Sequence, residues 1–268
     1  MIIIGEKLNG SIPSCAKAIA ARDEAYIKDL AKRQADAGAA FIDCCASVSE
    51  GELETLKWMI EMIQSATDCP ISVDSPDVRA IIDVMPFCKK PGLFNSVSCE
   101  GGKIDIVLPI LAQIEYIKWE VMALLCDDTG IPKTAAKRIE VFDRIMAKAK
   151  EYGIAESRIH IDPLVEMLCT TDDGAGVSLI LEVMAHIKAT HPKVHISGAI
   201  SNISYNLPIR RLVNQTFVVL AINAGMDSSV LDPLSQDLRG VIYAAEAMIG
   251  LDDYCAEYVS AYREGIFM

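Results

Sequence analysis

Short apolar segments recur along the chain at intervals of a few dozen residues, and most of them end on an aspartate or an asparagine. The eight segments are residues 2–4, 41–43, 71–74, 93–95, 121–126, 159–162, 195–200 and 226–231. Each has the length and apolar character of a strand buried in a parallel sheet. Buried strands that deliver polar side chains at their carboxyl ends are typical of an α/β barrel, whose active site lies on that rim.

Between these strands, segments with apolar residues at every third or fourth position predict amphipathic helices. They cover residues 25–37, 53–66, 134–152, 176–191, 209–224 and 234–249. Gly38 and Gly153 follow two of them, where a glycine commonly ends a helix. A last helix, over residues 252–263, is expected to close the bottom of the barrel.

Strands and helices alternate along the whole chain without a break in composition, so residues 1–268 are expected to form one domain. A doubly wound open sheet is the alternative, but its usual glycine-rich turn is not found. The first turn reads Gly5-Glu6-Lys7-Leu8-Asn9-Gly10, and the chain has no P-loop. A length of 268 residues fits one (β/α)8 TIM barrel, which typically takes about 250 residues.

Composition and charge narrow the classes of function. Hydrophobic residues make up 51% of the chain, and no apolar run approaches the roughly 20 residues of a membrane span. The formal charge of −12 argues against nucleic-acid binding, because phosphate contacts demand a basic surface. Nine dispersed cysteines, without a C-x-x-C pair or a zinc-type cluster, favour reduced thiols, no bound metal and a cytoplasmic protein.

Asp74, Asn95 and Asp162 end three of the predicted strands, so in a closed barrel their side chains would face a common cavity. Two carboxylates and an amide suit a neutral heterocycle with several N–H donors. A pterin ring fits, because its 2-amino group and N3–H pair with a carboxylate through two parallel charge-assisted hydrogen bonds. The alternative is that an individual aspartate caps the following helix, as Asp74-Ser75-Pro76 would allow.

The seventh strand leads into a polar segment, Ser201-Asn202-Ile203-Ser204-Tyr205-Asn206, which Arg210 soon follows. Asn202 is a candidate catalytic amide, because an amide can donate or accept a hydrogen bond and so follow a ring nitrogen through a change of protonation. From the spacing alone, an asparagine-rich turn without a catalytic role remains the preferred interpretation.

The order and spacing of several short motifs resemble the methyltetrahydrofolate:corrinoid protein methyltransferases. The motifs are Ile4-Gly5-Glu6-Lys7-Leu8-Asn9-Gly10, Val73-Asp74-Ser75, Asn95-Ser96, Thr129-Gly130-Ile131-Pro132, Ile161-Asp162-Pro163-Leu164, Ser201-Asn202-Ile203-Ser204 and Asn214-Gln215-Thr216-Phe217. These enzymes belong to the pterin-binding family, which includes dihydropteroate synthase and the folate module of cobalamin-dependent methionine synthase. The resemblance extends from Met1 to about the last helix.

The resemblance implies roles for the residues of the candidate site. Asp74, Asn95 and Asp162 would bind the pterin. Asn202, with Ser201 beside it, would lie at N5, the atom that carries or receives the methyl group.

Other positions match the family less closely. Arg210 corresponds to an arginine of the family's Ser-Asn loop region, and Asp127 stands where relatives carry Asn or Asp near the pterin. Both are therefore candidates for substrate binding. Cys45 stands where relatives commonly have Asn, and Tyr205 where the acetogenic branch has a polar residue.

The same resemblance implies the reactants. Tetrahydrofolate or methyltetrahydrofolate would be the substrate, and a methyl group would move in either direction between N5 and the cobalt of a separate corrinoid protein. That partner would supply the cobalamin, since this chain lacks the D-x-H-x-x-G signature of a corrinoid-binding module. Relatives are homodimers, so a homodimer is expected.

Two alternative functions use the same barrel. Dihydropteroate synthase typically carries Asn-Val-Thr-Pro-Asp-Ser-Phe-Ser-Asp near its start and a late Lys with Ser-x-Arg. This chain instead has Ser11-Ile12-Pro13 after Gly10 and lacks the S-x-R-K sequence. A non-catalytic pterin-binding protein would keep the pterin site without turnover. The motifs favour the methyltransferase over both.

Overall fold

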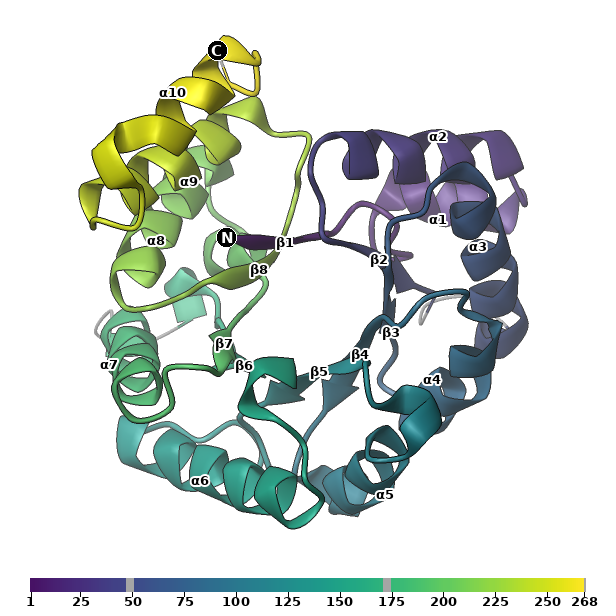
Figure 1. The fold of residues 1–268 in the computed structure, drawn as a ribbon, viewed down its shortest axis with the longest axis horizontal. Coiled ribbons are helices and arrows are strands. Elements are labelled where there is room, and N and C mark those ends of the chain that lie inside the picture. Colours follow the sequence, from purple (N-terminus) through teal and green to yellow (C-terminus); the bar gives the residue numbers. More distant parts are fainter. Residues whose placement is uncertain (47–50, 171–174, 268) are drawn as a thin grey trace.

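Eight parallel strands form a ring that helices cover from outside (Figure 1). The computed structural model describes residues 1–46, 51–170 and 175–267. The strands are β1 (Ile2–Gly5), β2 (Phe41–Cys45), β3 (Ile71–Asp74), β4 (Leu93–Val97), β5 (Glu120–Leu124), β6 (Ile159–Asp162), β7 (His195–Ile196) and β8 (Ser228–Leu231). The (β/α)8 barrel predicted from the sequence is therefore confirmed.

Strand pairing follows the chain from β1 to β7, and β8 returns to pair with β1. The pairing between β7 and β8 is shorter than that between the other neighbouring strands, because β7 contributes only two residues. A bridge between Ala199 and Val230 and a hydrogen bond from Asp227 N–H to the Ile196 carbonyl (3.2 Å) join the two strands. The ring is closed, so all strand carboxyl ends share one rim.

The described residues also form ten α-helices. They are α1 (Pro13–Ala20), α2 (Glu24–Asp36), α3 (Glu52–Ala66), α4 (Val78–Val84), α5 (Lys103–Leu111), α6 (Ala135–Glu151), α7 (Ala175–Thr190), α8 (Arg210–Asn223), α9 (Gln236–Met248) and α10 (Ala256–Arg263). Side-chain caps fix several starts: Asp23 accepts from Tyr26 N–H, and Thr134 from Lys137 N–H. None of these helices combines the length and apolar character needed to cross a membrane.

The last helix does not close the bottom of the barrel, so that expectation was wrong. Helix α10 lies outside α9 at the edge of the molecule (Figure 1), and Ala261 is its buried residue. Phe267, just beyond it, packs its ring near those of Tyr243 and Tyr258, with centroids 5.7 and 5.1 Å apart. The apolar face of this segment is therefore used against another helix rather than against the strand ends.

Apolar side chains gather in two places. The larger core lies between the outer surface of the strands and the helices. A smaller cluster fills the inside of the barrel and contains Ile4, Phe41, Leu93 and Met122. Because neighbouring residues of a strand point to opposite sides, β1, β2, β4 and β5 supply both regions. This explains why neighbours such as Phe41 and Ile42 are both apolar.

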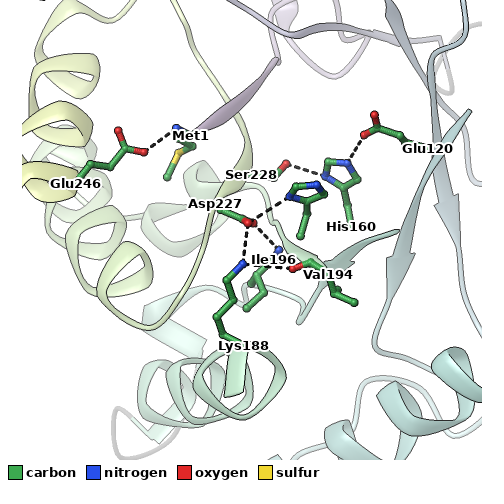
Figure 2. A network of polar contacts seen from close by, with 10 residues as sticks. Met1, Glu120, His160, Lys188, Val194, Ile196, Asp227, Ser228 and Glu246 are labelled. Carbon is green, nitrogen blue, oxygen red and sulfur yellow. Dashed lines mark hydrogen bonds and ion pairs between the residues drawn. The ribbon is translucent and has the colours of Figure 1, made fainter. Parts of the chain in front are cut away.

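The starts of the later strands place a polar network inside the barrel (Figure 2). The buried imidazole of His160 contacts Ser228 Oγ at 2.9 Å and Glu120 Oε2 at 2.6 Å. Its ring lies 4.8 Å from that of His195, measured between centroids. These groups occupy the end of the barrel that α10 had been expected to cover.

Asp227 connects this network to helix α7 (Figure 2). Its carboxylate lies 2.8 Å from Lys188 Nζ and 3.2 Å from His195 Nδ1, and it accepts a hydrogen bond from Ile196 N–H at 2.9 Å. Burial opposes its ionisation, but the hydrogen bonds from these donors hold the pKa of Asp227 at about 2. The charge therefore ties α7, β7 and β8 together at the seam of the barrel.

We expect Asp227→Asn to lower the free energy of unfolding by roughly 2 kcal/mol at neutral pH, because it removes a paired, partly buried charge. The pKa of Asp227 lies below that of an unfolded aspartate, so its contribution is complete above about pH 4 and is lost toward pH 2. Urea unfolding of both proteins at several pH values measures the difference.

Asp83→Asn, at an exposed aspartate of α4, is the matched control and should change stability by less than about 0.5 kcal/mol. If the difference between wild type and Asp227→Asn does not shrink as the pH falls, the proposed role of the charge is wrong.

Candidate active site

The strand register brings three of the predicted site residues to one rim. Asp74 of β3 lies beside Asn95 of β4 and, on its other side, beside Cys45 of β2. Asp162 ends β6 on the same rim and is paired with Leu124 of β5. This proximity follows from barrel closure, as the sequence predicted.

Asp74 does not cap the following helix. Helix α4 begins at Val78, and Asp77 is its cap, accepting a hydrogen bond from Arg79 N–H at 2.9 Å. Ser75 Oγ in turn accepts from Asp77 N–H at 3.0 Å. The capping alternative is therefore wrong for Asp74, because the helix starts four residues later, and its carboxylate is available to a ligand.

Asp43 supports the site from β2, and it was not among the predicted site residues. Ser72 Oγ donates to Asp43 Oδ1 at 2.7 Å, and Asn95 Nδ2 approaches the same oxygen at 3.2 Å. These contacts turn the amide nitrogen of Asn95 toward Asp43 and fix the orientation of its side chain. The signal that could have identified Asp43 is the one that identified Asp74, namely an aspartate in a buried strand.

The carboxylates of the rim are held in a desolvated environment. Burial raises the pKa of Asp74 to about 6, and burial likewise raises the pKa of Asp162 to about 6. Burial and the nearby charge of Asp74 raise the pKa of Asp43 well above its usual value. Carboxylates that have lost solvent in this way gain most from a ligand that supplies N–H donors.

The loop after β6 is built around Asp162 and a buried arginine. Leu164 N–H donates to Asp162 Oδ1 at 2.7 Å. Arg138 of α6 donates to the carbonyls of Pro163 and Leu164 and to Glu166 Oε2, the last at 2.7 Å. Arg138 therefore holds the loop in place, and the backbone of that loop engages Asp162 through its Oδ1.

Gly198 lets the chain after β7 pass close to Asp162. Its φ of +152° favours glycine. A Cβ atom here would lie 3.4 Å from Asp162 Oδ1 and 3.2 Å from Val165 Cγ2. A larger residue would strain the backbone and crowd the neighbouring Val165.

The Ser201-Asn202 segment forms a tight 3-10 turn, η7 (Ile200–Ser204), at the same end of the barrel. Arg210 braces this turn, donating to the Ser201 carbonyl at 2.7 Å and to Ser204 Oγ at 3.0 Å. Asn202 is exposed at its centre, and within the described part of the chain its side-chain amide has no hydrogen-bond partner. The geometry thus presents the Asn202 amide to a ligand and gives Arg210 a positioning task.

Glu6 is a further carboxylate of the site that sequence reasoning missed. It follows β1 directly, and Ser201 Oγ donates to its Oε2 at 3.2 Å. Burial and the charge of Asp232 raise the pKa of Glu6. Together with Ser201 and Arg210, it lines a cavity of about 320 Å³ beside η7. In the other strands a polar residue directly follows the apolar run. Gly5 stands between that run and Glu6, so Glu6 did not match this pattern.

In the described part of the chain, Asp127 makes no hydrogen bond or ion pair with the other predicted site residues; its partners are Thr129 and Arg144. Its carboxylate accepts from the backbone N–H (3.0 Å) and the hydroxyl (2.7 Å) of Thr129, and it pairs with Arg144. Hydrogen bonds from Thr129 and Arg144 lower the pKa of Asp127 to about 2. The side chain shapes the turn after β5, and its predicted contact with the pterin stays a prediction.

The arrangement as a whole is acidic. Among the residues that the structure describes, no three His, Cys, Asp or Glu side chains are placed to hold a metal ion. Desolvated carboxylates around an oriented Asn95 and beside an exposed Asn202 amide can bind a flat heterocycle through its N–H groups and contact one of its ring nitrogens.

Comparison with known proteins agrees with this geometry. A model of the family described as pterin binding enzyme matches residues 7–231. The methylcorrinoid:tetrahydrofolate methyltransferase of Eubacterium limosum is 46% identical over 266 residues, 99% of this chain and 97% of that protein. The methionine synthase of Mycobacterium tuberculosis is 27% identical over 241 residues, 86% of this chain and 20% of that protein.

A solved structure of dihydropteroate synthase from Yersinia pestis is similar in fold, with a TM-score of 0.63, 17% identity and 92% of each chain covered. At this identity the likeness concerns the fold alone. The family model and the full-length relative carry more weight. The chain belongs to the pterin-binding enzymes, in the family that includes the methylcorrinoid:tetrahydrofolate methyltransferase of Eubacterium limosum.

Proposed function

We propose that this chain is a methyltransferase that moves a methyl group from a methylated corrinoid protein to N5 of tetrahydrofolate. The observation that carries the proposal is the rim of the barrel, where Asp74 lies beside Asn95 and Asp162 ends β6, with the exposed amide of Asn202 at the same end. The full-length similarity to a methylcorrinoid:tetrahydrofolate methyltransferase supports the reactants and the direction.

The rim residues bind the pterin ring. At neutral pH, Asp74 and Asp162 are mainly ionised, because each has a pKa of about 6. A carboxylate in this state pairs with the 2-amino group and N3–H of the pterin through two parallel hydrogen bonds. Asn95, whose amide nitrogen is held by Asp43, offers its oxygen to a further N–H of the ring.

Methyl transfer itself needs no nucleophile from the protein. The lone pair of N5 forms the new bond to the methyl carbon, while the cobalt keeps the electron pair of the bond that breaks. N5 releases the proton that it carried to water at the open end of the barrel. The chain contributes mainly by holding the two bulky reactants in line, which is a large part of the barrier in a bimolecular displacement.

Asn202 forms a hydrogen bond with N5 during this step. Its amide oxygen can accept the N5 proton in a hydrogen bond before transfer, and its nitrogen can donate to a lone pair when the reaction runs in reverse. Arg210 keeps the turn in place through the Ser201 carbonyl, so that the amide stays at the barrel mouth. One residue thus serves both directions.

The cobalamin belongs to the partner in this proposal. A separate corrinoid protein approaches the open end of the barrel and presents its methyl group to N5, so this chain does not hold the cobalt. Assembly as a homodimer and a cytoplasmic location complete the proposal. The equilibrium mass in solution, by light scattering, tests the dimer.

Purified protein should convert a methylated corrinoid protein and tetrahydrofolate to methyltetrahydrofolate, with the change at cobalt followed by its absorption spectrum. The absence of any spectral change in either direction would contradict the proposal. Formation of dihydropteroate from a pterin diphosphate and p-aminobenzoate would show a dihydropteroate synthase instead.

Asn202→Ala should lower the turnover number for methyl transfer by roughly a hundredfold, because the residue acts on a proton-bearing atom in the transition state. The affinity for tetrahydrofolate should stay within about threefold, since the rim carboxylates remain. Single-turnover kinetics and equilibrium binding separate the two effects.

Asn223→Ala, at an exposed position near the end of α8, is the control and should match wild type in both measurements. A non-catalytic pterin-binding protein would show binding without turnover in wild type and variants alike. Equal loss of binding and turnover in Asn202→Ala would contradict the assigned role.

Asp74→Asn should abolish measurable pterin binding yet raise the free energy of unfolding at neutral pH by roughly 1–3 kcal/mol. The reason is that the pKa of Asp74 is raised by burial to about 6, so its ionised form destabilises the fold. Wild type therefore gains stability as the pH falls through about 6, and the variant should gain less. Thermal unfolding between about pH 5 and pH 8 measures both slopes; a less stable variant at neutral pH would contradict the assignment.

A further inference from the structure

Cys45 lies in the row of residues that forms the rim of the barrel, directly beside Asp74. Parallel pairing of β2 with β3 places Cys45 next to Asp74, and pairing of β3 with β4 places Asp74 next to Asn95. A bridge between Asn9 and Cys45 continues the row on the other side. Asp74 and Asn95 contact the pterin in the proposed function, whereas Cys45 has no assigned task there.

The alternation of side chains along the strands turns Cys45 and Asp74 toward the interior of the barrel. On β2, Phe41 belongs to the apolar cluster inside the barrel, whereas Cys44 belongs to the core between strands and helices. Because successive residues of a strand point to opposite sides, Cys45 points inward like Phe41. On β3, Val73 belongs to the outer core, so Asp74 also points inward. Cys45 is 4% exposed, and its thiol therefore lies within the rim rather than on the surface.

We propose that Cys45 is a positioning residue of the pterin site, whose thiol donates a hydrogen bond to Asp74 and holds that carboxylate in the orientation that binds the pterin. The inference rests on the proposed function, because it assumes that Asp74 binds the pterin ring. Asp43 gives the same kind of support to Asn95, whose amide nitrogen it contacts at 3.2 Å. Both ligand-binding side chains, on β3 and on β4, therefore have a supporting partner on β2.

Backbone hydrogen bonds on both sides fix the place of the Cys45 thiol. Cys45 N–H donates to the Leu8 carbonyl at 3.1 Å, and Gly10 N–H donates to the Cys45 carbonyl at 2.9 Å. With the backbone fixed, the sulfur can occupy only the staggered positions about a single torsion. The thiol is therefore held beside Asp74 by a short side chain, whose ordering costs little entropy.

The hydrogen bond from Cys45 favours the ionised form of Asp74 in surroundings that otherwise disfavour it. Burial raises the pKa of Asp74 to about 6, the hydrogen bond from Cys45 opposes this rise, and the charge of Glu52 adds to it. The acidic groups near this carboxylate are Glu52 of α3, Asp43 of β2 and Glu6 after β1. The thiol therefore supports an anion that its acidic neighbours destabilise.

Asp74 keeps enough acceptor positions for the pterin. A carboxylate has two oxygens with about four lone-pair positions, and the thiol of Cys45 occupies one of them. The 2-amino group and N3–H of the pterin need one position on each oxygen. The thiol thus restricts the rotation of the carboxylate without competing with the ligand.

Removal of the thiol should weaken pterin binding most where Asp74 is partly protonated. Calorimetric titration with 6-methyltetrahydropterin, without oxygen and from about pH 5.5 to about pH 8, gives the midpoint of each pH profile. We expect Cys45→Ala to raise this midpoint by roughly half to one pH unit and to weaken binding at neutral pH about threefold. At about pH 8, where Asp74 is ionised in both proteins, the affinities of variant and wild type should agree within about twofold.

Two further variants show whether the effect comes from the donor. Cys45→Ser supplies a hydroxyl donor and should return the midpoint to within about 0.3 pH unit of wild type. Cys44→Ala removes a thiol from the opposite side of the same strand, so it should leave the midpoint unchanged. Protonation of the pterin itself is common to all four proteins. A loss of affinity that is equal at every pH, or a Cys45→Ala profile equal to that of wild type, would overturn the assignment.

The stability of the ligand-free protein tests the contact independently of pterin binding. Wild type gains stability as the pH falls through about 6, because the ionised form of Asp74 destabilises the fold. Cys45→Ala should begin this gain at a higher pH, since the ionised form has lost a donor. In an Asp74→Asn background, Cys45→Ala should leave the pH dependence of stability unchanged.

An equal effect of Cys45→Ala on the pH dependence in both backgrounds would overturn the contact between Cys45 and Asp74. In that case methyl transfer by wild type would leave the proposed function standing. Failure of wild type to bind the pterin at any pH would overturn both proposals.

Discussion

The placement of carboxylates in a desolvated rim is the constraint on which the rest of the structure depends. Asp43, Asp74 and Asp162 each have a raised pKa because burial disfavours their charge. A site of this kind destabilises the fold unless a ligand supplies hydrogen-bond donors. The closed barrel can tolerate it because register, rather than local contacts, fixes where the three side chains lie.

The pKa values of buried aspartates are shifted in opposite directions at the two ends of the barrel. At the carboxyl rim, burial raises the pKa of Asp74 and Asp162, whereas near the strand starts the hydrogen bonds around Asp227 lower its pKa. The ionised forms of Asp74 and Asp162 destabilise the fold but can bind a ligand, whereas the ionised form of Asp227 stabilises the fold. This division matches the general separation of function and stability between the two faces of such barrels.

Strand ends were predictable because each combines a buried apolar run with a polar last residue, as in Asp74 and Asp162. Helices α4 and α5 were not predicted: α4 has seven residues, and α5 contains Pro109. Glu6 was missed because Gly5 interrupts the pattern. Arg144 contacts Asp127 across 17 residues of sequence, and Arg210 contacts the Ser201 carbonyl across nine. Periodicity does not encode such specific polar contacts.

The central claim is that ionised rim carboxylates hold the pterin ring. Its most direct test is the affinity of wild type for a pterin without a tail, measured by calorimetry from about pH 5 to about pH 7. With the pKa values of Asp74 and Asp162 at about 6, the dissociation constant should be lowest near neutral pH and rise steeply below about pH 6. A dissociation constant that stays the same over this range would contradict the account.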